Sequence, residues 1–154
     1  MNVGRRVDYA VRALCYLAAQ PATRSVPRTE IQLRQGIPPH YLSKILRALV
    51  AGGLLISVPG ARGGFRIKPE ARTVSLRTVF EAVEGPLELL DCIGDTGGSC
   101  GYTTVCTQVH AWRGAQALLE SYLDGISISD IADRHGLVVR LQDRSPSPGD
   151  LTLT

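Results

Sequence analysis

Three cysteines that could bind iron or zinc stand close together in the second half of the chain. Cys92, Cys100 and Cys106 fall within a span of 15 residues. Thiolates are soft, charged donors that bind both metals well. A cubane iron–sulfur cluster usually takes four thiolates, so three cysteines would leave one position for a different ligand. The spacing therefore predicts that these cysteines hold an iron–sulfur cluster or a metal ion.

Other interpretations of the cysteines stay open at this point. Zinc would take the same three thiolates with His110 as a fourth ligand. The three cysteines could equally lie in a surface loop without binding any metal. Cys15, the fourth cysteine, lies beside an apolar stripe and is expected to be a buried, inert thiol. The first residues show no secretory signal, so we expect a cytoplasmic protein whose cysteines are not in disulfides.

The residues around the cysteines predict a loop followed by a long helix. Residues 87–104 have no clear period and are rich in glycine, which indicates a loop. A helix is expected over residues 105–125, with Cys106 in its first turn, where a helix N-terminus favours the thiolate. Its predicted apolar side consists of Val105, Val109, Trp112, Ala115, Leu119, Tyr122 and Leu123.

The first half of the chain predicts a winged helix-turn-helix, a mainly α fold with a small β-wing. Hydrophobic periodicity and breakers predict helices over residues 5–20, 29–35, 38–51, 76–83 and 129–134, and strands over residues 54–58 and 65–68. In such a fold the second helix of the turn enters the major groove of DNA. An arginine at the tip of the hairpin suits a narrow minor groove. The predicted DNA contacts are Arg28, His40, Tyr41, Ser43, Lys44, Arg47, Arg62 and Gly63.

The charge of the chain is divided between its two halves. Residues 1–75 carry 12 lysines and arginines against 3 aspartates and glutamates, a net of +9. Residues 76–154 carry 5 against 11, a net of −6. A basic half favours a polyanionic partner such as double-stranded DNA. A solvated basic face, or a protein-interaction fold, is the alternative.

The sequence offers little support for an enzyme or a membrane protein. The three histidines form no catalytic triad or HExxH pattern, and the glycines near Arg62 match neither GxGxxG nor GxxxxGK[ST]. An electron carrier would need neither a wing nor a recognition helix. No apolar run approaches the roughly 18 residues that would cross a bilayer, so we expect no membrane partner.

Several short segments resemble the IscR/NsrR/RirA family of bacterial regulators. They are Asp-Tyr-Ala-Val-Arg-Ala-Leu at residues 8–14, Pro-His-Tyr-Leu at residues 39–42 and Gly-Ala-Arg-Gly-Gly-Phe at residues 60–65, together with the three cysteines. The likeness runs over about residues 3–135. It implies control of transcription, an iron–sulfur cluster, and a homodimer joined largely by the long helix from residue 105.

The resemblance also suggests the fourth ligand of the cluster. IscR-like members have a histidine three residues after the last cysteine, where this chain has Val109, with His110 one residue further. NsrR-like members use an aspartate of the first helix of the partner subunit, and Asp8 stands at that position. The ligand pattern is therefore closer to NsrR-like members, with His110 as the alternative. Arg12, one turn along, is expected to orient Asp8, although a helix-dipole role would also explain an aspartate there.

These observations predict three regions and one function. Residues 1–75 form a DNA-binding domain, residues 76–136 hold the cluster loop and dimerisation helix, and residues 137–154 form a disordered tail. The chain is expected to be a repressor whose operator affinity depends on an iron–sulfur cluster, [4Fe-4S] with [2Fe-2S] as the alternative. Its expected signal is nitric oxide or iron, cluster or redox status. A zinc-bound or cluster-free thiol-redox regulator is the second interpretation.

Overall fold

The computed structural model describes residues 4–93, 100–102 and 105–133, and within them the chain is mainly helical with a small two-stranded antiparallel sheet. The predicted fold class, mainly α with a β-wing, is confirmed. The predicted tail over residues 137–154 lies outside the described residues. In chain order the elements are α1 (Arg5–Ala18), α2 (Arg28–Gln35), α3 (Pro39–Ala51), β1 (Leu55–Val58), β2 (Gly64–Ile67), the 3-10 helix η1 (Pro69–Arg72), α4 (Leu76–Glu84), α5 (Val109–Asp124) and α6 (Ile128–Ala132).

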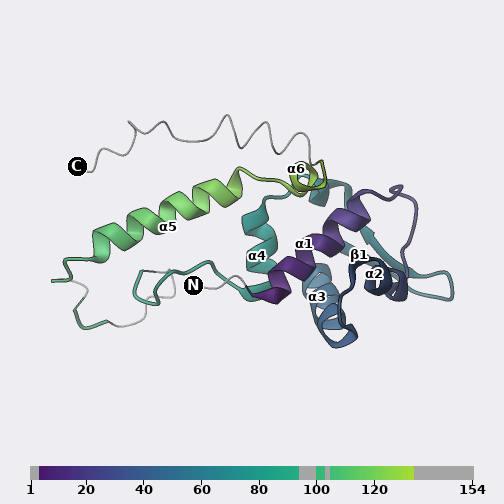
Figure 1. Cartoon of the computed structure of the whole chain (residues 1–154), viewed down its shortest axis with the longest axis horizontal. Helices are drawn as coiled ribbons and strands as arrows, with labels where there is room; N and C mark the ends of the chain where they lie inside the picture. Colours follow the sequence, from purple (N-terminus) through teal and green to yellow (C-terminus); the bar gives the residue numbers. More distant parts are fainter. Residues whose placement is uncertain (1–3, 94–99, 103–104, 134–154) are drawn as a thin grey trace.

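Helix α1 lies at the centre of the packed part of the molecule, in contact with α2, α3, α4 and α6 (Figure 1). Its buried side chains recur every three or four residues, so one face of the helix meets the core. They are Val7, Ala10, Ala13, Leu14 and Leu17. Two alanines on this face allow the neighbouring helices to approach closely. The first helix of the sequence therefore supports the elements of the predicted helix-turn-helix and the wing.

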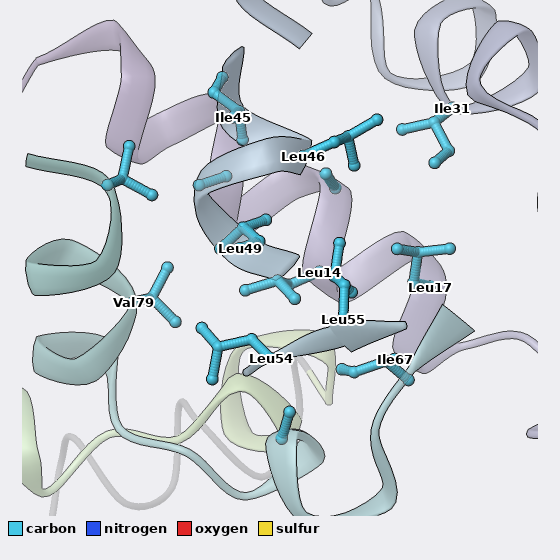
Figure 2. Close-up of a cluster of buried hydrophobic side chains, with 14 of the residues drawn as sticks. Leu14, Leu17, Ile31, Ile45, Leu46, Leu49, Leu54, Leu55, Ile67 and Val79 are labelled. Carbon is cyan, nitrogen blue, oxygen red and sulfur yellow. The ribbon is translucent and has the colours of Figure 1, made fainter. Parts of the chain in front are cut away.

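The hydrophobic core joins α1 and α3 to the wing and to α4 (Figure 2). Leu14, Leu46 and Leu49 are almost completely buried at its centre. The same cluster includes Val79 of α4 and Ile128 of α6, so it continues past residue 75. The division into domains at residues 75 and 136 stays a prediction, but α4 and α6 share their core with the helices that precede them.

The wing, which consists of β1, β2 and residues 59–63, is fastened to the core at its base. Its strands pair from Leu55 opposite Ile67 to Val58 opposite Gly64. Leu55 and Ile67 are buried, while the tip is exposed. Phe65 also exchanges two backbone hydrogen bonds with Val26, of 2.9 and 3.0 Å. The wing is therefore held both by its own core residues and by the segment that precedes α2.

The last long helix begins later than the sequence predicted. α5 starts at Val109, not at residue 105, so Cys106 lies ahead of the helix and not in its first turn. The backbone N–H of Val105 donates to the carbonyl of Tyr102 in a turn, and the β-branched Thr107 is a weak helix former. The prediction that Cys106 lies in the first turn of this helix, where the helix N-terminus would favour its thiolate, is therefore wrong. Other predicted helix and strand ends differ by one or two residues.

Helix α5 reaches away from the rest of the molecule (Figure 1). Val109 is its buried residue, whereas Trp112, Leu118 and Tyr122 are exposed, Leu118 by 71%. A helix that shows large apolar side chains to solvent in one chain is the kind of surface that another chain covers. None of the helices among the described residues is both long enough and apolar enough to cross a membrane.

Candidate functional site

The three predicted metal-binding cysteines meet at one cavity. Cys92, Cys100 and Cys106 line a space of about 100 Å³, which we call the thiol cavity. Leu90, Ile93, Gln108, Val109 and Trp112 complete its lining. The segment after α4 and the first turn of α5 therefore bring together thiols that are up to 14 positions apart in the sequence.

The three thiols line the same cavity, but they are not close enough together to bind one ion. Over residues 4–93, 100–102 and 105–133, no three side chains of histidine, cysteine, aspartate or glutamate are gathered closely enough to hold a metal ion. Cys92 and Cys106 are half-buried, and Cys100 is exposed. The donor chemistry fits a thiophilic metal centre, since three soft donors surround one largely apolar space.

The two candidates for a fourth ligand lie in different places. His110 is exposed on α5 and does not line the thiol cavity, although its neighbours Val109 and Trp112 do. Asp8 lies on α1 and also does not line it. Its carboxylate is paired with Arg12, whose Nε donates to Oδ1 at 3.0 Å and whose Nη2 lies 2.9 Å from Oδ2. Arg12 makes the contact that the spacing predicted, while the ligand role of Asp8 stays a prediction.

Cys15 is separate from the other thiols. It is half-buried on α1 and packs against the hydrophobic core. Its Sγ lies 3.9 Å from the carbonyl oxygen of Ile128. Burial raises the pKa of the Cys15 thiol, so less of it is the reactive thiolate at neutral pH. These features agree with the predicted role of Cys15 as an inert core residue.

Basic side chains lie exposed among the predicted DNA-contact residues of α3, whereas Tyr41 and Ser43 are half-buried. His40, Lys44 and Arg47 are exposed. Ser43 is half-buried and makes two hydrogen bonds within the protein. Its Oγ accepts from Arg28 Nη1 at 2.7 Å and donates to the carbonyl oxygen of Pro39 at 3.1 Å. Arg28, the first residue of α2, is thereby held against α3, which is the predicted recognition helix, the one expected to enter the major groove.

A groove of about 400 Å³ runs between α3 and the wing. Three predicted DNA-contact residues, Arg28, Ser43 and Arg47, line it, and so does Ser57 of β1. Its remaining lining residues are Leu46, Val50 and Phe65. We call this space the α3–wing groove. Ser57 was missed from the sequence because one serine in a short strand gives no sign of which surface it will face.

Aromatic contacts link α1 to the start of α3. The Tyr9 and Tyr41 rings meet edge to face, with centroids 5.7 Å apart, and the His40 ring lies 4.4 Å from that of Tyr41. The Arg12 guanidinium lies 5.8 Å from the centre of the Tyr9 ring. Asp8, Arg12, Tyr9, Tyr41 and His40 are therefore joined by a continuous series of contacts.

The wing tip depends on glycine. Arg62 is exposed there, as predicted. A Cβ on Gly63 would overlap the carbonyl oxygen of Val58, and one on Gly64 would overlap that of Val26. These glycines therefore allow the chain's own backbone to pack closely at the wing, and a direct contact of Gly63 with DNA stays a prediction.

Comparison with known proteins identifies the family. The sequence profile of the Rrf2 family, described as iron-dependent transcriptional regulators, matches residues 3–134. The chain belongs to the Rrf2 family. This confirms the resemblance drawn from residues 8–14, 39–42 and 60–65.

Named members of the Rrf2 family and related structures agree with this assignment. The chain is 32% identical over 144 residues to the HTH-type transcriptional regulator IscR of Vibrio vulnificus. The alignment covers 94% of this chain and 84% of that protein. Its fold is similar to that of T. potens IscR, with a TM-score of 0.65, 22% identity and coverage of 99% and 97%. It is also similar to CymR, the global cysteine regulator of B. subtilis, with a TM-score of 0.68, 18% identity and coverage of 87% and 98%.

Membership of the Rrf2 family gives the basic elements of this chain a role. It is a transcriptional regulator, and its winged-helix fold is that of the IscR and CymR structures. Its named relatives are transcriptional regulators and not enzymes. The surface that α2, α3 and the wing form is accordingly the candidate DNA interface of an Rrf2 regulator.

Proposed function

We propose that this Rrf2-family protein is a homodimeric repressor whose affinity for operator DNA depends on an iron–sulfur cluster held by Cys92, Cys100 and Cys106. The observation that carries the proposal is that all three thiols line one cavity. The description of the family as iron-dependent supports iron over zinc. As a regulator that binds DNA, the protein is proposed to act in the cytoplasm.

Asp8 of the partner subunit is the proposed fourth ligand. Asp8 is 48% exposed on α1, so a second chain can reach it. His110 is the weaker candidate, because a ligand from the same chain would have to line the thiol cavity and His110 does not. Three cysteines and one carboxylate match the four sites of a [4Fe-4S] cluster, with [2Fe-2S] as the alternative. Such a cluster would supply a centre that nitric oxide, oxidants or iron shortage can modify or remove.

Side-chain contacts within the chain connect the proposed ligand to the DNA-binding surface. Asp8 pairs with Arg12, and the Arg12 guanidinium contacts the ring of Tyr9. Tyr9 in turn packs on Tyr41 at the first turn of α3. A change in the partner of the Asp8 carboxylate would alter the position of Arg12 and its contact with Tyr9. Since Tyr41 adjoins His40, the start of the recognition helix is sensitive to that change.

The dimer is proposed from the exposed side of α5. Trp112, Leu118 and Tyr122 leave apolar surface uncovered in one chain. Covering them with the same helix of a second chain would bury this surface and bring two recognition helices to one DNA duplex, as two-fold symmetric operators require.

The proposal is tested by purifying the protein under argon and measuring iron, acid-labile sulfide and visible absorbance per chain. DNA binding of the cluster-loaded and cluster-free forms is then compared on a duplex selected from a random pool by the loaded protein. We expect iron and sulfide, and weaker binding by the cluster-free form. Equal affinity of the two forms would overturn the proposed switch.

A thiol-redox regulator, with zinc or without a metal, is the second candidate. The exposure of Cys100 favours it, because an accessible thiol can be oxidised. The same elemental analysis separates the two candidates. Zinc at one per chain, without iron or sulfide, would support the second.

A further inference from the structure

The α3–wing groove lies where a DNA strand has to pass if the proposed function holds. In a winged helix-turn-helix the recognition helix enters the major groove, and we expect the wing at the adjacent minor groove. These two grooves of DNA are separated by one sugar–phosphate strand. We propose that the α3–wing groove seats this strand, that Arg28 and Arg47 bind its phosphate, and that Ser43 positions Arg28.

The lining of the groove matches the chemistry of a sugar–phosphate strand. Arg28, Arg47 and Ser57 are exposed, whereas Leu46 is buried and Val50 and Phe65 are half-buried. The groove thus has a polar rim and an apolar floor. Deoxyribose presents an apolar surface to such a floor. The two guanidinium groups can bind phosphate oxygens through paired N–H donors. Of the described residues that line the groove, none is acidic.

Ser43 has a positioning role because its single hydroxyl hydrogen is already used. The hydroxyl donates to the carbonyl oxygen of Pro39 and accepts from Arg28. Phosphate oxygens only accept hydrogen bonds at neutral pH, so Ser43 cannot donate to a phosphate while it keeps the bond to Pro39. Ser43 instead holds the guanidinium of Arg28, the first residue of α2, beside Arg47 of α3.

Ser57 is the wing's contribution to this site. It lies opposite Phe65 in the sheet, and both residues line the groove. Its exposed hydroxyl is a further donor for a phosphate oxygen, on the side of the strand away from α3. The groove therefore contacts the DNA strand from the recognition helix and from the wing at once, which couples the positions of these two elements on DNA.

Salt dependence of DNA binding tests this proposal directly. The full-length protein is titrated into a fluorescein-labelled duplex of about 30 base pairs of mixed sequence, at salt concentrations from about 50 to about 200 mM. Losing one phosphate contact reduces the slope of log affinity against log salt by about 0.9, so a variant of the proposed dimer, which loses one contact in each subunit, should show a slope reduced by about 1.8. We expect this reduction for Arg28→Ala and Arg47→Ala, and also for Arg28→Gln, which keeps the length of the side chain.

Two matched variants control for charge alone. Arg28→Lys keeps the positive charge and should keep the slope of the wild type. Arg34→Ala removes the same charge from α2 at an exposed position that does not line the groove, and it should also keep the slope. A slope reduced equally by Arg34→Ala would mean that general charge, not this groove, is responsible.

A double-mutant cycle tests the role of Ser43. At the value of an ordinary intramolecular hydrogen bond, loss of the Ser43–Arg28 contact predicts that Ser43→Ala weakens binding about three- to tenfold in the wild type. It should have no further effect in the Arg28→Ala background. Equal weakening in both backgrounds would show that Ser43 contacts DNA itself.

The wild-type result separates this proposal from the proposed function. If the wild type binds the duplex but Arg28→Ala and Arg28→Gln keep its slope, the phosphate site is overturned and the regulator remains. If the wild type binds neither this duplex nor one selected from a random pool, both are overturned. Ethylation interference on the selected duplex provides a second measurement, since interference by ethylation of the contacted phosphate should depend on Arg28.

Discussion

Arg12 and Asp8, one turn apart on α1, form a two-point ion pair in which Nε and Nη2 lie 3.0 and 2.9 Å from the two carboxylate oxygens. Both side chains are about half exposed. An exposed pair at this helical spacing contributes about 0.5 kcal/mol or less to stability. Substitutions at Asp8 should therefore leave the fold intact, which makes the pair suitable for testing a functional role.

Asp8→Ala should remove or alter the iron–sulfur cluster without unfolding the protein. The cluster would lose its proposed ligand from the partner subunit, so the visible spectrum under argon should change and the cluster should be lost faster. His110→Ala, which affects a residue outside the thiol cavity, should leave the spectrum unchanged. A normal cluster in Asp8→Ala together with its loss in His110→Ala would reverse the assignment.

Leu118→Glu should dissociate the proposed dimer. Leu118 is 71% exposed in one chain, and a carboxylate on a buried apolar interface must be desolvated. We expect the dissociation constant of the dimer to rise at least about a hundredfold, measured by sedimentation velocity across protein concentrations. Leu33→Glu provides a matched control, because Leu33 is 80% exposed on α2, far from α5. A dimer that survives Leu118→Glu unchanged would contradict an α5 interface.

Arg72→Ala should destabilise the fold through the end of α1. Arg72 donates from Nη1 to the carbonyl oxygen of Ala18 at 2.5 Å and from Nη2 to that of Gln20 at 3.0 Å. These carbonyls have no partner within the helix. The substitution should cost about 1–3 kcal/mol of unfolding free energy, measured by urea denaturation at constant protein concentration. Arg72→Lys keeps the charge but has one nitrogen, so its unfolding free energy should lie between those of the wild type and Arg72→Ala. An Arg72→Ala variant as stable as the wild type would exclude this capping role.

Glu30 should make the stability of the protein depend on acid pH. A hydrogen bond from Tyr16, and then one from Arg24, lower the pKa of Glu30 below its usual value. A carboxyl with a lowered folded pKa stabilises the fold above its unfolded pKa of about 4.3. This stabilisation is lost as the pH falls from there through the lowered pKa of the folded state.

Urea denaturation between about pH 7 and about pH 3 measures this contribution as a difference between variants. The wild type should lose more stability on acidification than Glu30→Gln, which cannot titrate at this position. Tyr16→Phe removes the 2.6 Å hydrogen bond to Glu30 and should give an intermediate profile. Parallel profiles for the wild type and Glu30→Gln would show that Glu30 does not contribute.

Most helices of this protein follow from local sequence signals. The apolar period of α1 and α3, Ser75 before α4 and the glycines of the wing act over a few residues, so they are visible without a structure. Ser75 accepts from the backbone N–H of Thr78 as an N-cap should. The start of α5 was placed too early, because the apolar Val105 continues the helical period although its backbone lies in a turn.

The types and spacing of its residues determined that this chain has a basic winged helix-turn-helix and three thiols able to hold a metal centre. Only the tertiary structure decided that the thiols share one cavity, that Ser43 holds Arg28, and that Ser57 faces the same groove. Arg72, in a 3-10 helix that was not predicted, reaches α1 across more than 50 positions of the sequence. Such contacts depend on how helices and strands pack in space, and the period of a single helix or strand carries no information about its neighbours.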